Sequence, residues 1–135
     1  PTPGTVVPVV PTVPATTPAT TPAPAPTDSS GPTISGLVAQ PAVIYWPRQC
    51  RPPYTATVSA TVTDEAGVAA VTARVTSVLG ASTTTLTGGP TYSVVIGPFV
   101  DVAARSVEVT VTFSATDRFG NESTATTVVT WTMAC

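Results

Sequence analysis

Lysine and histidine are both absent from this chain of 135 residues, so all five basic residues are arginines. Without histidine the chain lacks the commonest general base and the commonest metal ligand, and without lysine it lacks the amine that forms Schiff bases. We therefore expect a protein that is not an enzyme and has no cofactor. A GC-rich genome, which encodes arginine and alanine in place of lysine, is a second explanation for the missing lysine.

Charge is scarce, with a net charge of −2, and the arginines are scattered without forming a stripe. Capture of a nucleic-acid backbone needs such a stripe, so we expect no nucleic-acid partner. No apolar run approaches the roughly 20 residues that span a bilayer, so we expect no membrane insertion by these residues. Because the chain opens at Pro1 without a signal peptide, we expect a fragment of a longer protein with a covalently attached neighbouring domain.

The chain has two cysteines, Cys50 and Cys135. An even number of cysteines in a threonine-rich chain that carries a linker predicts export and a disulfide. Two free thiols in a cytosolic protein are the alternative. A zinc site is disfavoured, because two cysteines without histidine cannot fill four coordination positions.

The first 32 residues hold ten of the sixteen prolines, a single charge at Asp28 and no aromatic residue. Proline fixes φ and disfavours helix in the residue before it, so this segment is predicted to be a disordered, extended polyproline II linker. It would act as a stalk that holds a domain away from its surroundings, and its threonines permit O-glycosylation. A passive tether is the alternative.

From Thr33 onward the composition changes, and apolar residues alternate with threonine or serine. This period of two is typical of strands with one face in the core and one in water. The two clearest strands place these residues inward: Tyr54, Ala56, Val58, Ala60 and Val62, then Val107, Val109, Val111, Phe113 and Ala115.

Further strands are predicted at 71–75, 82–86, 92–96 and 129–133, and an opening strand covers 34–38 and 43–46. Pro41 interrupts that opening strand, which fits a sheet edge or a kink where the chain changes sheets. No window shows a helical period. Residues 33–135 are therefore predicted to form an all-β domain, a seven-stranded antiparallel sandwich.

Two strand ends carry the same turn sequence. Thr63-Asp64-Glu65-Ala66-Gly67 and Thr116-Asp117-Arg118-Phe119-Gly120 share a pattern in which Asp accepts backbone N–H groups and Gly adopts positive φ. The stretches 61–71 and 113–123 that contain these turns resemble the signature stretches of bacterial immunoglobulin-like modules, which are fibronectin type III-like.

That resemblance covers most of residues 33–135 and implies an immunoglobulin-like sandwich of the kind appended to secreted hydrolases, adhesins and receptor ectodomains, often in actinobacteria. Such modules serve as spacers, adhesive modules or carbohydrate-contacting accessories. The chain departs from antibody domains, because Val58 and Val111 stand where those domains have their inter-sheet cysteine pair. In the implied topology Cys50 and Cys135 lie at one end of the sandwich, which predicts a Cys50–Cys135 disulfide.

The implied topology places two acidic loops together at the other end. Hard oxygen ligands from these loops could hold Ca²⁺, and the candidates are Asp64, Glu65, Asp117, Asn121 and Glu122. The alternative is that each Asp caps its own turn. The same loops contain a glycosylation pattern, Asn121-Glu122-Ser123, which has no meaning if the source is bacterial.

Aromatic and basic residues gather around the first bend, where they could contact a sugar ring or an anionic wall polymer. The candidates are Tyr45, Trp46, Arg48 and Arg51. The alternatives are core positions for the two aromatics and a solvated loop for the two arginines; Tyr54 and Trp131 are expected in the core.

The sequence thus predicts an exported, monomeric accessory module, found outside the cell or on its surface. Its predicted role is that of a spacer or adhesive module that contacts polysaccharide or cell wall. A ligand-sensing ectodomain of a membrane-anchored regulator, such as a kinase or an anti-sigma factor, is the alternative.

Overall fold

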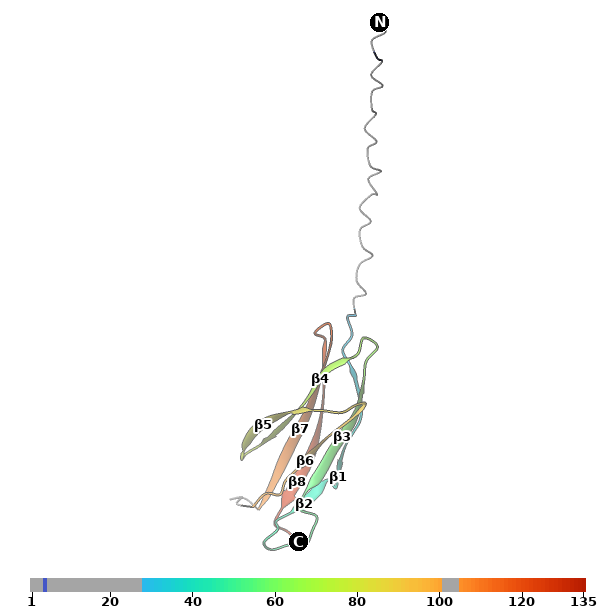
Figure 1. Ribbon diagram of the computed structural model, residues 1–135. Coiled ribbons are helices and arrows are strands. Elements are labelled where there is room, and N and C mark those ends of the chain that lie inside the picture. Colours follow the sequence, from blue (N-terminus) through green and yellow to red (C-terminus); the bar gives the residue numbers. More distant parts are fainter. Residues whose placement is uncertain (1–3, 5–27, 101–104) are drawn as a thin grey trace.

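The chain forms eight β-strands in a computed structural model that describes residues 4, 28–100 and 105–135 (Figure 1). Within these residues there is no helix, and hence none that could cross a membrane. The strands, in chain order, are β1 (Thr33–Gln40), β2 (Val43–Tyr45), β3 (Ala56–Thr63), β4 (Val68–Ser77), β5 (Gly80–Leu86), β6 (Thr91–Ile96), β7 (Ser106–Asp117) and β8 (Glu122–Thr132).

The strands form two sheets that pack as a sandwich. One sheet has the order β1-β3-β6 and the other has the order β2-β8-β7-β4-β5. The predicted all-β class and two-sheet architecture are confirmed, and the arrangement is compatible with an immunoglobulin-like module.

The predicted count of seven strands is wrong, because the opening strand is two strands in different sheets. β1 ends at Gln40 and pairs with β3, whereas β2 begins at Val43 and pairs with β8. Pro41 lies at this break, where its missing N–H cannot continue a ladder. The pairing of β2 with β8 is also parallel, so the sandwich is not wholly antiparallel as predicted.

The interior is filled mostly by valine and alanine. The inward positions predicted for β7 are all buried, as are those of β3 from Ala56 to Val62. Phe113 and Trp131 are the two largest side chains of the core, at 0% and 1% exposure. Each buried valine or larger side chain contributes roughly 1.5–3 kcal/mol of hydrophobic stabilisation, so the alternating pattern on β3 and β7 accounts for much of the driving force.

Tyr54, which was predicted to point into the core, is only half-buried, as are several apolar residues of the other predicted strands. Tyr54 precedes the first residue of β3, and Met133 follows the last residue of β8. Val75, Tyr92 and Val94 pack against the core from within their strands but are likewise partly exposed.

The first strand begins at Thr33, and residues 28–32 before it lie against the domain. The Asn121 side-chain amide donates a hydrogen bond of 2.7 Å to the Asp28 carbonyl, and Pro32 is buried. Most of the segment predicted to be an extended polyproline II linker, residues 1–3 and 5–27, lies outside the described residues.

Truncating the core tests the packing. Phe113→Ala is expected to lower the free energy of unfolding by about 3–5 kcal/mol, because the removed ring leaves a cavity between the sheets. Thr124→Ala, at an exposed position of the neighbouring strand β8, should change it by no more than about 0.5 kcal/mol. Urea denaturation of both variants measures the difference, and equal effects would contradict the assignment of the core.

Candidate functional site

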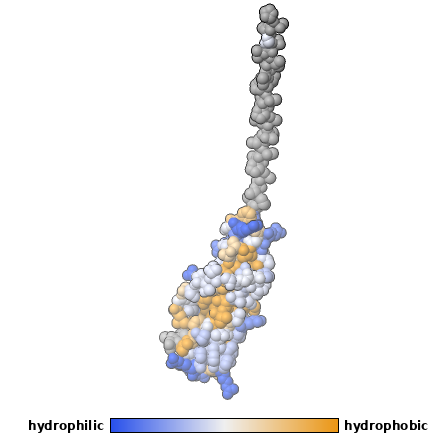
Figure 2. All heavy atoms as spheres, in the orientation of Figure 1, coloured by the Kyte–Doolittle hydropathy of each residue, from blue (hydrophilic) through white to orange (hydrophobic). Residues whose placement is uncertain are grey.

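Strongly hydrophilic residues lie at both ends of the sandwich, with a few more on its flanks (Figure 2). The end with the β3–β4 and β7–β8 loops, where residue 28 enters, is called the linker pole. The opposite end holds Cys50, Cys135 and the loop 46–55, and is called the disulfide pole. Each pole contains one set of the residues that the sequence singled out.

At the linker pole the two predicted Asp turns are built alike. The Asp64 carboxylate accepts a 2.8 Å hydrogen bond from the Ala66 N–H, and the Asp117 carboxylate accepts one of the same length from the Phe119 N–H. Gly67 and Gly120 close the two loops with φ of 95° and 84°, which other residues rarely adopt. Each Asp therefore caps its own turn.

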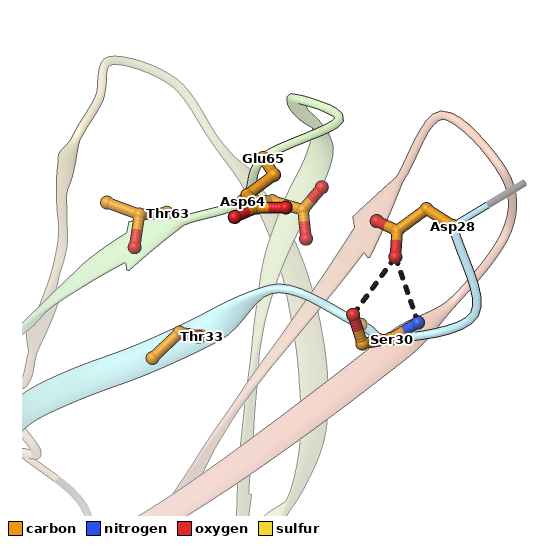
Figure 3. Close-up of a pocket in the computed structure, with 7 residues that line it drawn as sticks. Asp28, Ser30, Thr33, Thr63, Asp64 and Glu65 are labelled. Carbon is orange, nitrogen blue, oxygen red and sulfur yellow. Dashed lines mark hydrogen bonds between the residues drawn. The ribbon is translucent and has the colours of Figure 1, made fainter. Parts of the chain in front are cut away.

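A third carboxylate joins these two from the end of the linker. Single oxygens of Asp28, Asp64 and Asp117 all lie within 4.8 Å of one another. Asp28 is held by Ser30, whose N–H and hydroxyl donate hydrogen bonds of 3.1 and 3.0 Å to it. Figure 3 shows Asp28, Asp64 and Glu65 around one open depression of about 580 Å³.

Asp117 is the most buried of the three carboxylates, at 3% exposure. Burial alone would raise its pKa, but hydrogen bonds from the Asn121 side chain and from the Asn121 and Phe119 N–H groups outweigh burial and hold the pKa below its ordinary value of 3.8. Asp117 is therefore ionised at neutral pH and serves as the acceptor that organises the β7–β8 loop.

The five residues predicted to bind Ca²⁺ are not equivalent. Asp64, Glu65 and Asp117 offer carboxylates, but Asn121 turns its amide nitrogen, a donor and no cation ligand, toward Asp28 and Asp117. Glu122 is exposed at the first position of β8. Calcium binding at the linker pole stays a prediction, and Asp28 is a further oxygen donor for it.

At the disulfide pole, Cys50 and Cys135 are joined by a disulfide across a Cα–Cα distance of 5.7 Å. The loop that carries Cys50 is held by its own hydrogen bonds. The Tyr54 hydroxyl donates to the Cys50 carbonyl at 2.9 Å, and the Cys50 N–H donates to the Trp46 carbonyl at 3.0 Å. The disulfide ties this loop to the chain beyond β8.

The two aromatic residues of the first bend have different environments. Trp46 is half-buried against the core, and its indole N–H donates a 2.7 Å hydrogen bond to the Val100 carbonyl. Tyr45 lines an open depression of about 540 Å³ beside the disulfide. Tyr45 is therefore better placed than Trp46 to meet a ligand.

The depression beside the disulfide combines aromatic, amide and basic side chains. Arg51 lines it, whereas Arg48 is exposed in the same loop but is not among the described residues that line it. An aromatic ring, an amide and a guanidinium are groups suited to sugars and carboxylates. The lining residues are Tyr45, Gln49, Cys50, Arg51, Pro52, Ala134 and Cys135.

Sequence reasoning missed Asp28, Gln49 and Arg105, the last of which lies next to Gln49 at the disulfide pole. Asp28 carried a signal, because it is the only charge in the first 32 residues. Gln49 and Arg105 carried none, since only the fold brings position 105 beside the loop 46–55.

Comparison of the chain with family models, with curated proteins and with solved structures finds no match.

The disulfide gives a direct prediction. No thiol should react under denaturing, non-reducing conditions, and Cys50→Ser with Cys135→Ser should lower the free energy of unfolding by up to about 4–5 kcal/mol. The reason is that the bond closes a loop across 85 residues of sequence, which restricts the unfolded chain. Two reactive thiols in the wild-type protein would contradict it.

Acid should destabilise the domain partly through Asp117. Because the pKa of Asp117 is lower in the folded state than in the unfolded chain, its stabilising effect is complete above the unfolded pKa and disappears as pH falls through the folded pKa. Denaturation between pH 7 and 2 should therefore show stability falling below about pH 5. Asp117→Asn should flatten this fall, and an equal flattening in the exposed control Glu108→Gln would contradict the assignment.

Proposed function

We propose that the chain is an exported, non-catalytic accessory module with an immunoglobulin-like fold, which contacts polysaccharide or cell-wall material through the depression at its disulfide pole. The observation that carries the proposal is the separation of the two poles. The chain enters at Asp28 on the linker pole, and the depression lined by Tyr45 and Arg51 lies at the opposite end. Residues 28–32 are not among the described residues that line the depression, so the entry of the linker does not cover it.

The order of the strands supports the immunoglobulin-like assignment. The sheet β1-β3-β6 faces a sheet in which β8, β7 and β4 are adjacent. In immunoglobulin sandwiches the strands lettered C, F and G form one sheet in the same way, and β4, β7 and β8 correspond to them. The disulfide supports export, since such bonds persist mainly in oxidising compartments.

A binding role fits the chemistry of the poles better than a catalytic one. At the linker pole, Asp64 and Asp117 are committed to capping turns, and the depression beside them is open. At the disulfide pole, the described residues around the depression include no Asp or Glu side chain. The Tyr45 ring can stack on a ligand and the Arg51 guanidinium can pair with an anion. Both interactions contribute binding affinity and neither catalyses a reaction.

The full chain should sediment with at least one of insoluble cellulose, chitin and peptidoglycan. Tyr45→Ala should weaken that binding by about tenfold, as expected for an aromatic residue at a contact. The matched control is Phe119→Ala, which removes an exposed aromatic ring from the linker pole and should leave binding unchanged. Binding to none of the three polymers would contradict the adhesive role and leave that of a spacer.

A further inference from the structure

A second depression lies next to the first at the disulfide pole. It has a volume of about 340 Å³ and is lined by Gln49, Arg105, Met133 and Ala134. Gln49 and Ala134 also line the depression that contains Tyr45 and Arg51. The two depressions are therefore neighbours, and together they form what we call the Arg51–Arg105 groove.

The groove has one arginine in each half and no acidic residue among the described residues that line it. Within the described part of the chain, neither Arg51 nor Arg105 has a carboxylate partner. Five of the six acidic residues that the structure describes lie at the linker pole, namely Asp28, Asp64, Glu65, Asp117 and Glu122, and the sixth, Glu108, is exposed on β7. Among the described residues, the lining of the groove therefore carries two guanidinium groups and no Asp or Glu, which favours an anionic ligand.

The walls of the groove are fixed before any ligand arrives. The disulfide holds Cys50 to Cys135, and the Arg105 carbonyl accepts a 2.9 Å hydrogen bond from the Met133 N–H. The backbone N–H of Trp46 donates a 3.2 Å hydrogen bond to the Thr132 carbonyl. Backbone on both sides of the groove is thus anchored to the end of β8 and to the residues that follow it, which lowers the entropy lost on binding.

We propose that the Arg51–Arg105 groove binds an acidic polysaccharide, with each guanidinium paired to a carboxylate of the polymer. Tyr45 and Gln49 then contact the sugar rings, the first by its aromatic face and the second by its amide. Guanidinium and carboxylate form paired hydrogen bonds that are about twice as strong as neutral ones. Two separated arginines are too few for the backbone of a nucleic acid, which favours the sugar acid. This proposal rests on the proposed function and names its ligand class.

The test uses polygalacturonate as the probe and its fully methyl-esterified form as the matched neutral polymer. The wild-type full chain should bind the acid at least tenfold more tightly than the ester, and added salt should weaken that binding. Arg51→Gln and Arg105→Gln should each reduce affinity by about tenfold. The control Arg74→Gln alters an exposed arginine on β4 and should have no effect.

The three variants change exposed side chains, so their melting temperatures should equal that of the wild type. Equal affinity for the acid and the ester would overturn the proposal that the groove binds an acidic polysaccharide. Unchanged binding of the acid by the Arg51→Gln/Arg105→Gln double variant would overturn it as well. Either result would leave the proposed polysaccharide contact through Tyr45 standing. Inorganic polyphosphate bound as tightly as polygalacturonate would also overturn the assignment to a sugar acid, because charge alone would then suffice. Binding to no polysaccharide would remove both proposals.

Discussion

The alternation of small apolar residues with threonine along β3 and β7 decides which faces of the two sheets can meet. Valine and alanine are the most frequent residues between the sheets, and Phe113 and Trp131 supply the two largest side chains there. Because this burial gives each strand one inward face, a shift of one residue would expose the whole set to water. The loops at both poles, and everything they carry, are positioned by that register.

The period of two was enough to predict the sandwich and to find the buried residues of β3 and β7. The division of the opening strand was harder to predict, since Pro41 is compatible with either a sheet edge or a change of sheet. β2 is only three residues long and pairs in parallel with β8, too short for any periodic signal. Arg105 was missed because its neighbours at the groove, Gln49 and Ala134, come from distant parts of the sequence.

The two poles use their charges differently. At the linker pole, two carboxylates stabilise the loops, because Asp64 and Asp117 accept hydrogen bonds from backbone N–H groups. The Asn121 amide donates hydrogen bonds to both Asp117 and the Asp28 carbonyl, and so connects the loop to the incoming chain. At the disulfide pole, Arg51 and Arg105 are exposed. The first arrangement fixes how the domain joins residues 28–32. The second leaves two guanidinium groups exposed at the end of the domain opposite to residue 28.

The Cys50–Cys135 bond also determines how the domain carries a mechanical load. Tension between residue 28 and Cys135 runs along residues 28–50 and then crosses directly between the sulfur atoms, so β3 to β8 lie in a covalent ring outside the loaded path. Only β1 and β2 can be drawn out, by at most about 75 Å of extended chain. In the reduced protein the same tension would reach every strand.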